Sequence, residues 1–224
     1  VPAVVTGAGT WYDYSMSPGN PAPQYYAAAP LAAQTLSRSG DGGIQHGGNV
    51  STATKHVVSS TASFSAGASP PTLYLYDRVL CYEANAFTAA ANQNMTNGVA
   101  AARWIGAGEG GLKMQLTGQT VFGATASNLT ALSYTDQDGN PGATTGATGI
   151  GAAPTLGRCW QLPLAAGDSG VQTVTNVAGG TGSAGTANIL VLRPLGEGRI
   201  KIANDQDLQE IGRASCRERV SSPV

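Results

Sequence analysis

The stretches that decide the fold are LTALSYTDQDGNPGATTG (Leu129–Gly146), WQLPLAAGDSGVQTVTNV (Trp160–Val177) and TANILVLRPL (Thr186–Leu195). Short runs of Leu, Val, Ile, Thr and Tyr are separated in them by clusters of Gly, Asn, Asp and Pro. This pattern is typical of β-strands joined by tight turns. We therefore expect an all-β fold.

The strongest strand signal lies upstream, in TLYLYDRVLCY (Thr72–Tyr82). Alternation places Leu73, Leu75, Val79 and Cys81 on one face and Tyr74, Tyr76, Arg78 and Tyr82 on the other. Asp77 falls on the apolar face, and we expect Arg193 to be its partner.

Further strands are expected on both sides of the central stretches. Leu112–Phe122 alternates, with Leu112, Met114, Leu116 and Phe122 predicted inward and Lys113, Gln115, Thr117 and Gln119 outward. Glu83–Ala102 is rich in Ala and Asn, and we expect a long loop there. The remaining expected strands are Leu129–Thr135, Trp160–Leu164, Val171–Val177, Ala187–Leu195 and Arg199–Ala203. Seven or eight strands at this spacing predict an antiparallel β-sandwich, jelly-roll-like, with an extended N-terminal arm.

We expect three regions in the chain: an arm over residues 1–60, the β-sandwich over 61–205 and a tail over 206–224. A long helix is excluded from the arm by Pro18, Pro21, Pro23 and Pro30. Its aromatic residues are candidates for anchoring it to its own domain or to a neighbour. A leader without fixed contacts is the alternative interpretation. The candidate interface residues are Trp11, Tyr12, Tyr14, Tyr25 and Tyr26.

The tail differs in composition from the rest of the chain. Ile211–Val220 reads IGRASCRERV and resembles, codon for codon, the translation of a common sequencing-library adapter, with Glu210 at the junction. We therefore expect an artefactual segment from about residue 210 and exclude it from the interpretation of fold and function.

Charged residues make up 11% of the chain, far below the ~25% of typical globular proteins. Such a composition suits a subunit whose surface is largely covered by neighbours. The formal net charge of −1 gives no electrostatic reason to expect nucleic-acid or membrane partners. No apolar run reaches transmembrane length.

Cysteine and histidine patterns predict no metal site and no cofactor. Cys81 and Cys159 have no CxxC or His/Cys spacing. A Cys81–Cys159 disulfide and two buried free thiols both remain open, and the free thiols are the expected state in a protein assembled inside a cell. His46 and His56 have no second ligand at metal-binding spacing and are expected at the surface or an interface.

The segment Gly167–Gly170 spells GDSG, the tetrapeptide around the nucleophile of chymotrypsin-like proteases. Such a site also needs a histidine base, an orienting carboxylate and oxyanion donors. The flanking residues Val171 and Gln172 differ from the protease pattern, and the sequences around both histidines do too. An ordinary turn is therefore expected, with no catalytic residue.

Two other short motifs fail their context. Gly106, Gly108 and Gly111 satisfy GxGxxG, but the residues that follow predict a strand, whereas a dinucleotide site needs a helix N-terminus. Asp136, Asp138 and Asn140 suggest a calcium loop, yet the EF-hand glycine and glutamate positions are not matched. A β-turn is expected there.

Four segments resemble, in order, a group of small β-rich structural proteins of tailed-phage virions. They are PTLYLYDRVLCY (Pro71–Tyr82), LTALSYTDQDGNPGATT (Leu129–Thr145), LPLAAGDSGVQTVTNV (Leu162–Val177) and ANILVLRPL (Ala187–Leu195). In that group an L-Y-D-R-L strand precedes an S-Y-T-N-Q-D-G hairpin, and an L-V-L-x-R-P strand follows. The resemblance implies a head-associated or decoration-type protein without catalytic residues.

Taken together, these observations predict a non-enzymatic virion protein that stabilises the particle through subunit contacts. Its expected partners are the major capsid protein or other virion subunits, and a homo-oligomer is expected. The alternative is a tail-fibre or spike module that binds host glycans, with Tyr74, Tyr76 and Tyr82 as an aromatic platform.

Overall fold

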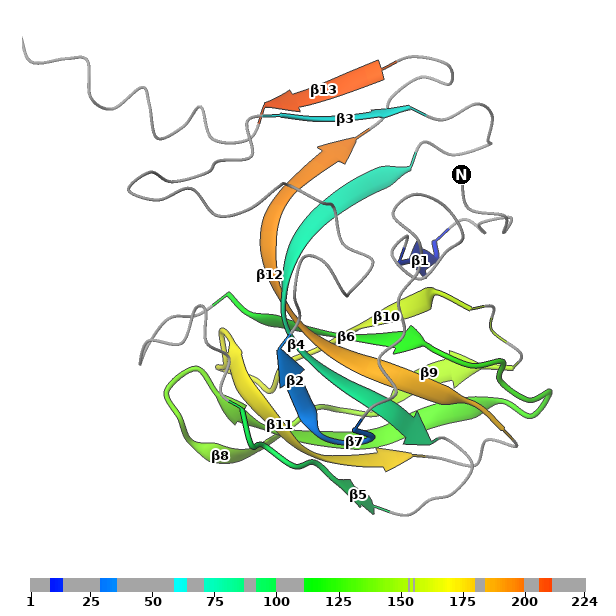
Figure 1. Cartoon of the computed structure of the whole chain (residues 1–224), viewed down its shortest axis with the longest axis vertical. Coiled ribbons are helices and arrows are strands. Elements are labelled where there is room, and N and C mark those ends of the chain that lie inside the picture. Colours follow the sequence, from blue (N-terminus) through cyan, green and yellow to red (C-terminus); the bar gives the residue numbers. More distant parts are fainter. Residues whose placement is uncertain are drawn as a thin grey trace, which may run out of the picture. The chain divides into compact units, whose positions relative to one another are not determined.

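The computed structural model describes residues 9–13, 29–35, 59–63, 71–86, 92–99, 111–152, 154, 156–179, 184–199 and 206–210. Every regular element among these residues is a β-strand (Figure 1). Most strands form two antiparallel sheets that pack against each other, so most of the described part of the chain forms the β-sandwich that the sequence predicts.

The larger sheet has six strands, two of them from the N-terminal segment. In spatial order they are β1 (Trp11–Tyr12), β10 (Arg158–Leu162), β6 (Lys113–Gly118), β12 (Thr186–Arg199), β4 (Thr72–Ala86) and β2 (Ala33–Thr35). The second sheet contains β5 (Asn92–Asn94), β11 (Val171–Gly179), β7 (Ser127–Asp136) and β8 (Pro141–Thr144), and β9 (Thr148–Gly151) also pairs with β7.

Eight of these strands follow a jelly-roll order. Counted along the chain, the first to the eighth are β4, β5, β6, β7, β8, β10, β11 and β12. One sheet then holds the first, eighth, third and sixth strands side by side, and the other holds the second, seventh, fourth and fifth. The chain crosses between the sheets at almost every connection, as a double Greek key requires. The expected jelly-roll arrangement is therefore present, with β1 and β2 added at its edges.

The chain divides into two compact units. The first, Val1–Gln45 with Arg78–Arg193, contains the sandwich. The second, His46–Asp77 with Pro194–Val224, contains an antiparallel pair of strands, β3 (Ser59–Ser63) and β13 (Gln206–Glu210). β4 and β12 contribute residues to both units. β13 ends at Glu210, and the adapter-like residues 211–220, Cys216 among them, lie outside the described residues.

The core lies between the two sheets of the first unit, and β11 shows how the sequence builds it. Val171, Val174 and Val177 are all buried. Side chains of a regular strand alternate with period two, so valines three residues apart reach the same face only where the strand bulges. The pairing of β11 with β7 shifts register between Val171 and Thr173 and again between Val174 and Asn176. These bulges turn all three valines toward the other sheet.

The prediction of a loop over Glu83–Ala102 is wrong in two places. β4 continues to Ala86, and Asn92–Asn94 form an edge strand that pairs with β11. The Gln93 side chain explains how so polar a segment becomes a strand. Its amide accepts a hydrogen bond from the Ala86 backbone N–H and donates one to the Ala86 carbonyl, both at 2.8 Å.

The strand expected over Leu112–Phe122 is shorter than predicted, because β6 ends at Gly118. All four residues predicted inward are nevertheless buried in the core, and Phe122 reaches it from the loop after the strand. The prediction that Gln115 and Thr117 face solvent is wrong, since both are buried. Of the expected strand Arg199–Ala203, Arg199 ends β12 and residues 200–203 lie outside the described residues.

Candidate functional site

Two of the five predicted interface aromatics lie among the described residues. Trp11 and Tyr12 form β1, which pairs antiparallel with Cys159 and Arg158 of β10. Trp11 remains 36% exposed, and Tyr12 is half-buried. Tyr14, Tyr25 and Tyr26 lie outside the described residues. The described part of the expected arm therefore contacts its own domain and leaves one large indole accessible.

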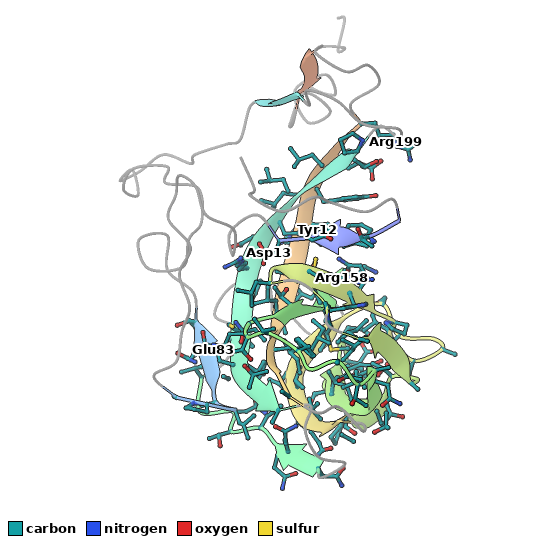
Figure 2. All side chains as sticks on the ribbon, turned by 90° about the vertical axis from the view of Figure 1, so that its right-hand side faces the viewer. Tyr12, Asp13, Glu83, Arg158 and Arg199 are labelled. Carbon is teal, nitrogen blue, oxygen red and sulfur yellow. The ribbon has the colours of Figure 1, made fainter. Side chains whose placement is uncertain are left out.

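An ion pair holds this segment in place. The Asp13 carboxylate accepts hydrogen bonds from Arg78 Nη2 at 2.9 and 3.1 Å, and both side chains are mostly buried. The Asp13 backbone N–H donates to the Gly157 carbonyl at 2.7 Å. Figure 2 shows Tyr12 and Asp13 on the β1 segment beside Arg158. The arm residues thus connect β10 to β4 across the face of the larger sheet.

The strands at the ends of both sheets are short. β1 and β2 have two and three residues, and β5 and β8 have three and four, with Pro141 opening β8. Short edge strands and proline are common devices against edge-to-edge pairing with another chain. Strand addition at an edge is therefore a poor route for a partner to reach the described sandwich.

Within the first unit, the larger sheet is buried on its second face as well as on its core face. Side chains that pair across β10, β6 and β12 on this second face include Gln115, Thr117, Cys159, Asn188 and Leu190. All five are buried within the chain itself. A polar ladder runs among them, because Gln161 Nε2 donates to Gln115 Oε1 at 2.8 Å and Gln115 Nε2 donates to Thr117 Oγ1 at 3.2 Å. This part of the described sheet therefore offers little surface to a partner.

The two upstream cysteines are free and buried, which was the expected state. Cys159 on β10 and Cys81 on β4 are separated by β6 and β12. Three strand spacings of ~4.8 Å put them about 14 Å apart, well beyond disulfide reach. Burial raises the pKa of both thiols, so they are inert rather than nucleophilic.

The smaller sheet, in contrast, exposes one face. A row of directly paired residues crosses all four strands: Asn94, Asn176, Ser133 and Thr144. Neighbouring pairs extend this surface, which we call the polar face. It comprises Asn92, Asn94, Ala131, Ser133, Thr135, Thr144, Thr173, Asn176 and Ala178.

All nine side chains of the polar face are exposed or half-exposed, and none is charged, aromatic or a large aliphatic group. Asn176 Nδ2 donates to Asn94 Oδ1 at 2.8 Å, and Thr173 Oγ1 donates to Thr135 Oγ1 at 3.2 Å. Within the described part of the chain, the Ser133 and Thr144 hydroxyls make no hydrogen bond. The polar face is therefore an uncharged surface with hydrogen-bonding groups available.

The GDSG segment forms the turn before β11, as expected. Gly167 has φ +97°, a backbone conformation that favours glycine. The Asp168 carboxylate accepts a hydrogen bond from the hydroxyl of buried Tyr134, and that hydroxyl accepts one from the Ala165 N–H at 2.7 Å. The carboxylate next to Ser169 thus anchors a loop, and His46 and His56 lie outside the described residues.

Gln137 joins this turn to the β7–β8 hairpin. Its Oε1 accepts from the Ser169 and Gly170 N–H groups at 3.0 and 3.1 Å, and its carbonyl accepts from Gln172 Nε2 at 3.0 Å. The Ser169 carbonyl in turn accepts from the Gly111 N–H at 2.8 Å. One end of the sandwich is therefore fixed by hydrogen bonds between backbone groups and glutamine side chains.

The suspected calcium loop is a hairpin turn, as expected. Asp136 Oδ1 accepts from the N–H groups of Asp138 and Asn140 at 2.9 and 2.8 Å, and Asp136 Oδ2 accepts from Asn140 Nδ2 at 3.0 Å. These bonds, led by the one from the Asn140 side chain, lower the pKa of Asp136. Its oxygens are already occupied. The described residues contain no group of three or more His, Cys, Asp or Glu that could hold a metal ion.

The three-tyrosine platform considered from the sequence does not form. Tyr82 is completely buried in the core, where its hydroxyl donates to Asn97 Oδ1 at 2.7 Å. Tyr74 and Tyr76 stack on each other, with ring centroids 6.2 Å apart. The alternation of the strand placed all three tyrosines on one face in the sequence-based prediction, but only Tyr74 and Tyr76 stack on each other.

The polar face was missed in the sequence because small polar residues carry little signal. The usable signal was positional: Ala131, Ser133 and Thr135 alternate with buried Leu132 and Tyr134. In a predicted β-sandwich, uncharged small residues at every second position of a strand indicate an exposed face without charged groups.

Within the described residues no helix is long and apolar enough to span a membrane. Comparison of the chain with protein-family models, with curated proteins and with solved structures finds no match.

Proposed function

We propose that this chain is a non-enzymatic structural protein of a tailed-phage virion, a capsid decoration or minor head component that stabilises the particle through subunit contacts. The segments that resemble such proteins lie on the jelly-roll strands β4, β7, β8, β11 and β12 and the turns between them. Jelly rolls serve both viral capsids and lectins, so the choice depends on the exposed surface.

The observation that carries the proposal is the contrast between the two sheets. Within the first unit, residues 114–118 of β6 and 187–192 of β12 in the larger sheet are buried on both faces and the edge strands are short, whereas the smaller sheet exposes the neutral polar face. Charged groups are depleted at the centres of protein interfaces because their desolvation is costly. A neighbouring subunit can cover the polar face without desolvating any charge, while amide and hydroxyl groups supply hydrogen bonds.

The partners proposed for this surface are the major capsid protein or other virion subunits, with a homo-oligomer as the assembled form. Trp11 extends the contact area at the edge of the other sheet, since it exposes an indole beside Arg158 and Cys159. Aromatic side chains of this kind are enriched among residues that dominate binding energy.

Glycan binding is the second candidate, and one observation favours it. The Ser133 and Thr144 hydroxyls are available, and sugars present the same neutral donors and acceptors. The polar face has no aromatic ring to stack on a sugar, and Tyr82 is in the core. We therefore place glycan binding behind a structural role.

The test places a positive charge on the polar face. Ser133→Lys and Thr173→Lys are matched with Ala126→Lys, which lies at an exposed position outside that face. Each variant replaces the wild-type chain during particle production, and its copy number in purified particles is measured. We expect at least a roughly tenfold loss for the two face variants, an unchanged copy number for Ala126→Lys, and unfolding free energies within about 0.5 kcal/mol of wild type.

Wild-type incorporation of both face variants would contradict the proposed docking face. Normal incorporation together with loss of binding to immobilised host glycans would establish the second candidate instead.

A further inference from the structure

A hydrogen-bonded lock joins the two sheets at Tyr82. Its hydroxyl, which reaches across the core from β4, accepts a bond from the Val174 N–H at 3.1 Å and donates to Asn97 Oδ1 at 2.7 Å. Asn97 Nδ2 donates to the Val174 carbonyl at 2.8 Å. The three residues thus close a ring of bonds, which we call the Tyr82 lock.

The residue that follows Asn97 in the chain makes its side-chain amide chemically labile. This residue is Gly98, and Asn97-Gly98 is the only Asn-Gly pair in the chain. Both residues are exposed, and a Cβ added at Gly98 would meet nothing within 4 Å. Among the described residues the Gly98 N–H has no hydrogen-bond partner, whereas the Thr96 and Met95 N–H groups are bonded to Leu31 and Thr175.

We propose that Asn97 is a spontaneous deamidation site whose rate is restrained by the Tyr82 lock and whose conversion opens that lock. The Gly98 backbone nitrogen attacks Asn97 Cγ, the new C–N bond closes a five-membered imide, and the Cγ–Nδ2 bond breaks with release of ammonia. Water then opens the imide to aspartate or isoaspartate. Glycine permits this closure because it has no side chain and tolerates the required backbone rotation.

The products do not fit the lock. In the intact chain Asn97 Nδ2 donates to the Val174 carbonyl. Deamidation replaces this donor with a carboxylate oxygen, so that two hydrogen-bond acceptors, the carboxylate and the carbonyl, face each other. Isoaspartate also lengthens the backbone by one carbon. In either case the hydrogen bond from Asn97 to the Val174 carbonyl of β11 is lost.

The chain supplies its own internal controls. Trypsin releases Val79–Arg103 as one peptide, which carries Asn92 and Asn94 followed by Gln93 and Met95. The purified full chain is incubated at pH 8.5 and 37 °C, and the 1 Da mass increase is assigned by fragmentation at each asparagine. We expect conversion at Asn97 to precede conversion at Asn92 and Asn94.

Three variants separate the steps. Tyr82→Phe removes one bond to Asn97, and we expect its conversion to be roughly fivefold faster, from the usual strength of a single hydrogen bond. Gly98→Ala, which fits without a clash, should suppress conversion. Asn97→Asp should lower the unfolding midpoint in urea, whereas Asn94→Asp should not, because Asn94 only accepts a bond from Asn176.

Conversion of Asn97 at the same rate as Asn92 and Asn94 would overturn the site. An unchanged rate in Tyr82→Phe would overturn the restraint by the lock. If Tyr82→Phe unfolds, the deamidation of Asn92 and Asn94 becomes faster as well. In that case the wild-type chain is incubated at urea concentrations below its unfolding transition. The deamidation rate of Asn97 must then increase at a lower urea concentration than the one that unfolds the whole chain.

Discussion

Two buried tyrosines act in the same way at different places in the sandwich. Each hydroxyl accepts a backbone N–H from a loop or strand and donates to a side-chain oxygen: Val174 and Asn97 for Tyr82, Ala165 and Asp168 for Tyr134. Such a hydroxyl satisfies groups that would otherwise be buried without partners.

The Tyr134 hydroxyl can be tested by removing it alone. Tyr134→Phe keeps the ring in the core but leaves the Ala165 N–H and the Asp168 carboxylate without this partner. We expect a loss of about 1–3 kcal/mol in the free energy of unfolding, measured by urea denaturation. Ser133→Ala, which removes a hydroxyl without hydrogen bonds, is the control. A similar loss in both variants would contradict the assigned role.

The same tyrosines predict a loss of stability at alkaline pH. Burial is the main cause that raises the pKa of Tyr82 and of Tyr134 from 10 to about 12. Because the folded-state pKa lies above the unfolded value, the two neutral hydroxyls make their full contribution to the free energy of unfolding below pH 10. That contribution is lost as the pH rises from 10 towards 12. We expect the unfolding free energy to decrease over that interval, and to decrease less in Tyr134→Phe and Tyr82→Phe. A pH-independent stability up to pH 12 would contradict the assignment.

At the scale of elements, the turn into β12 depends on one glycine. Gly185 has φ +114°, and a Cβ there would lie 2.8 Å from Phe122 Cγ and 3.0 Å from Phe122 Cα. Overpacking alone predicts a loss of about 1–3 kcal/mol for Gly185→Ala. Gly149→Ala in β9 is the matched control, because a Cβ there meets nothing within 4 Å. Equal unfolding midpoints for the two variants would show that the close approach to Phe122 is unimportant.

The N-terminal edge strand depends on the Asp13–Arg78 pair. A double-mutant cycle of Asp13→Ala and Arg78→Ala isolates this pair from the other contacts of each residue. For a mostly buried carboxylate that accepts two bonds from a guanidinium, we expect a coupling of about 1–3 kcal/mol in the unfolding free energy. A coupling near zero would mean that β1 is held by its pairing with β10 alone.

The sequence predicts the strands that are stabilised by their own apolar residues better than those that depend on tertiary contacts. β4, β7, β11 and β12 contain long apolar runs, and their existence was predicted. β1, β2 and β5 have two or three residues each, and their positions depend on tertiary contacts such as Asp13–Arg78 and Gln93–Ala86. The bulges of β11 were visible as a valine spacing of three, but the register shifts that produce them needed the partner strand.

At the scale of the whole molecule, the sandwich class and the jelly-roll order were predictable because turn clusters and apolar runs alternate along most of the chain. The burial of the second face of the larger sheet within the first unit was not predictable, since Gln115 and Thr117 look like solvent-facing residues in a local pattern. The candidate site was likewise hidden. The polar face exists only when Asn94, Asn176, Ser133 and Thr144, spread over four strands, are brought into one row.

The proposed role assigns the neutral polar face to a neighbour in a virion. It also relates the low charge of the chain, 11% of residues, to a surface that is covered after assembly. The same chain outside a particle would expose that face, so free subunits are expected to associate through it.

Quantitative peptide mass spectrometry of purified phage particles from the sample that carries this gene tests the central claim most directly. Peptides from Thr72–Arg199 at a copy number close to that of the major capsid protein are the result that the account predicts. A few copies per particle would point to a fibre or spike, and absence from the particles would contradict a virion role.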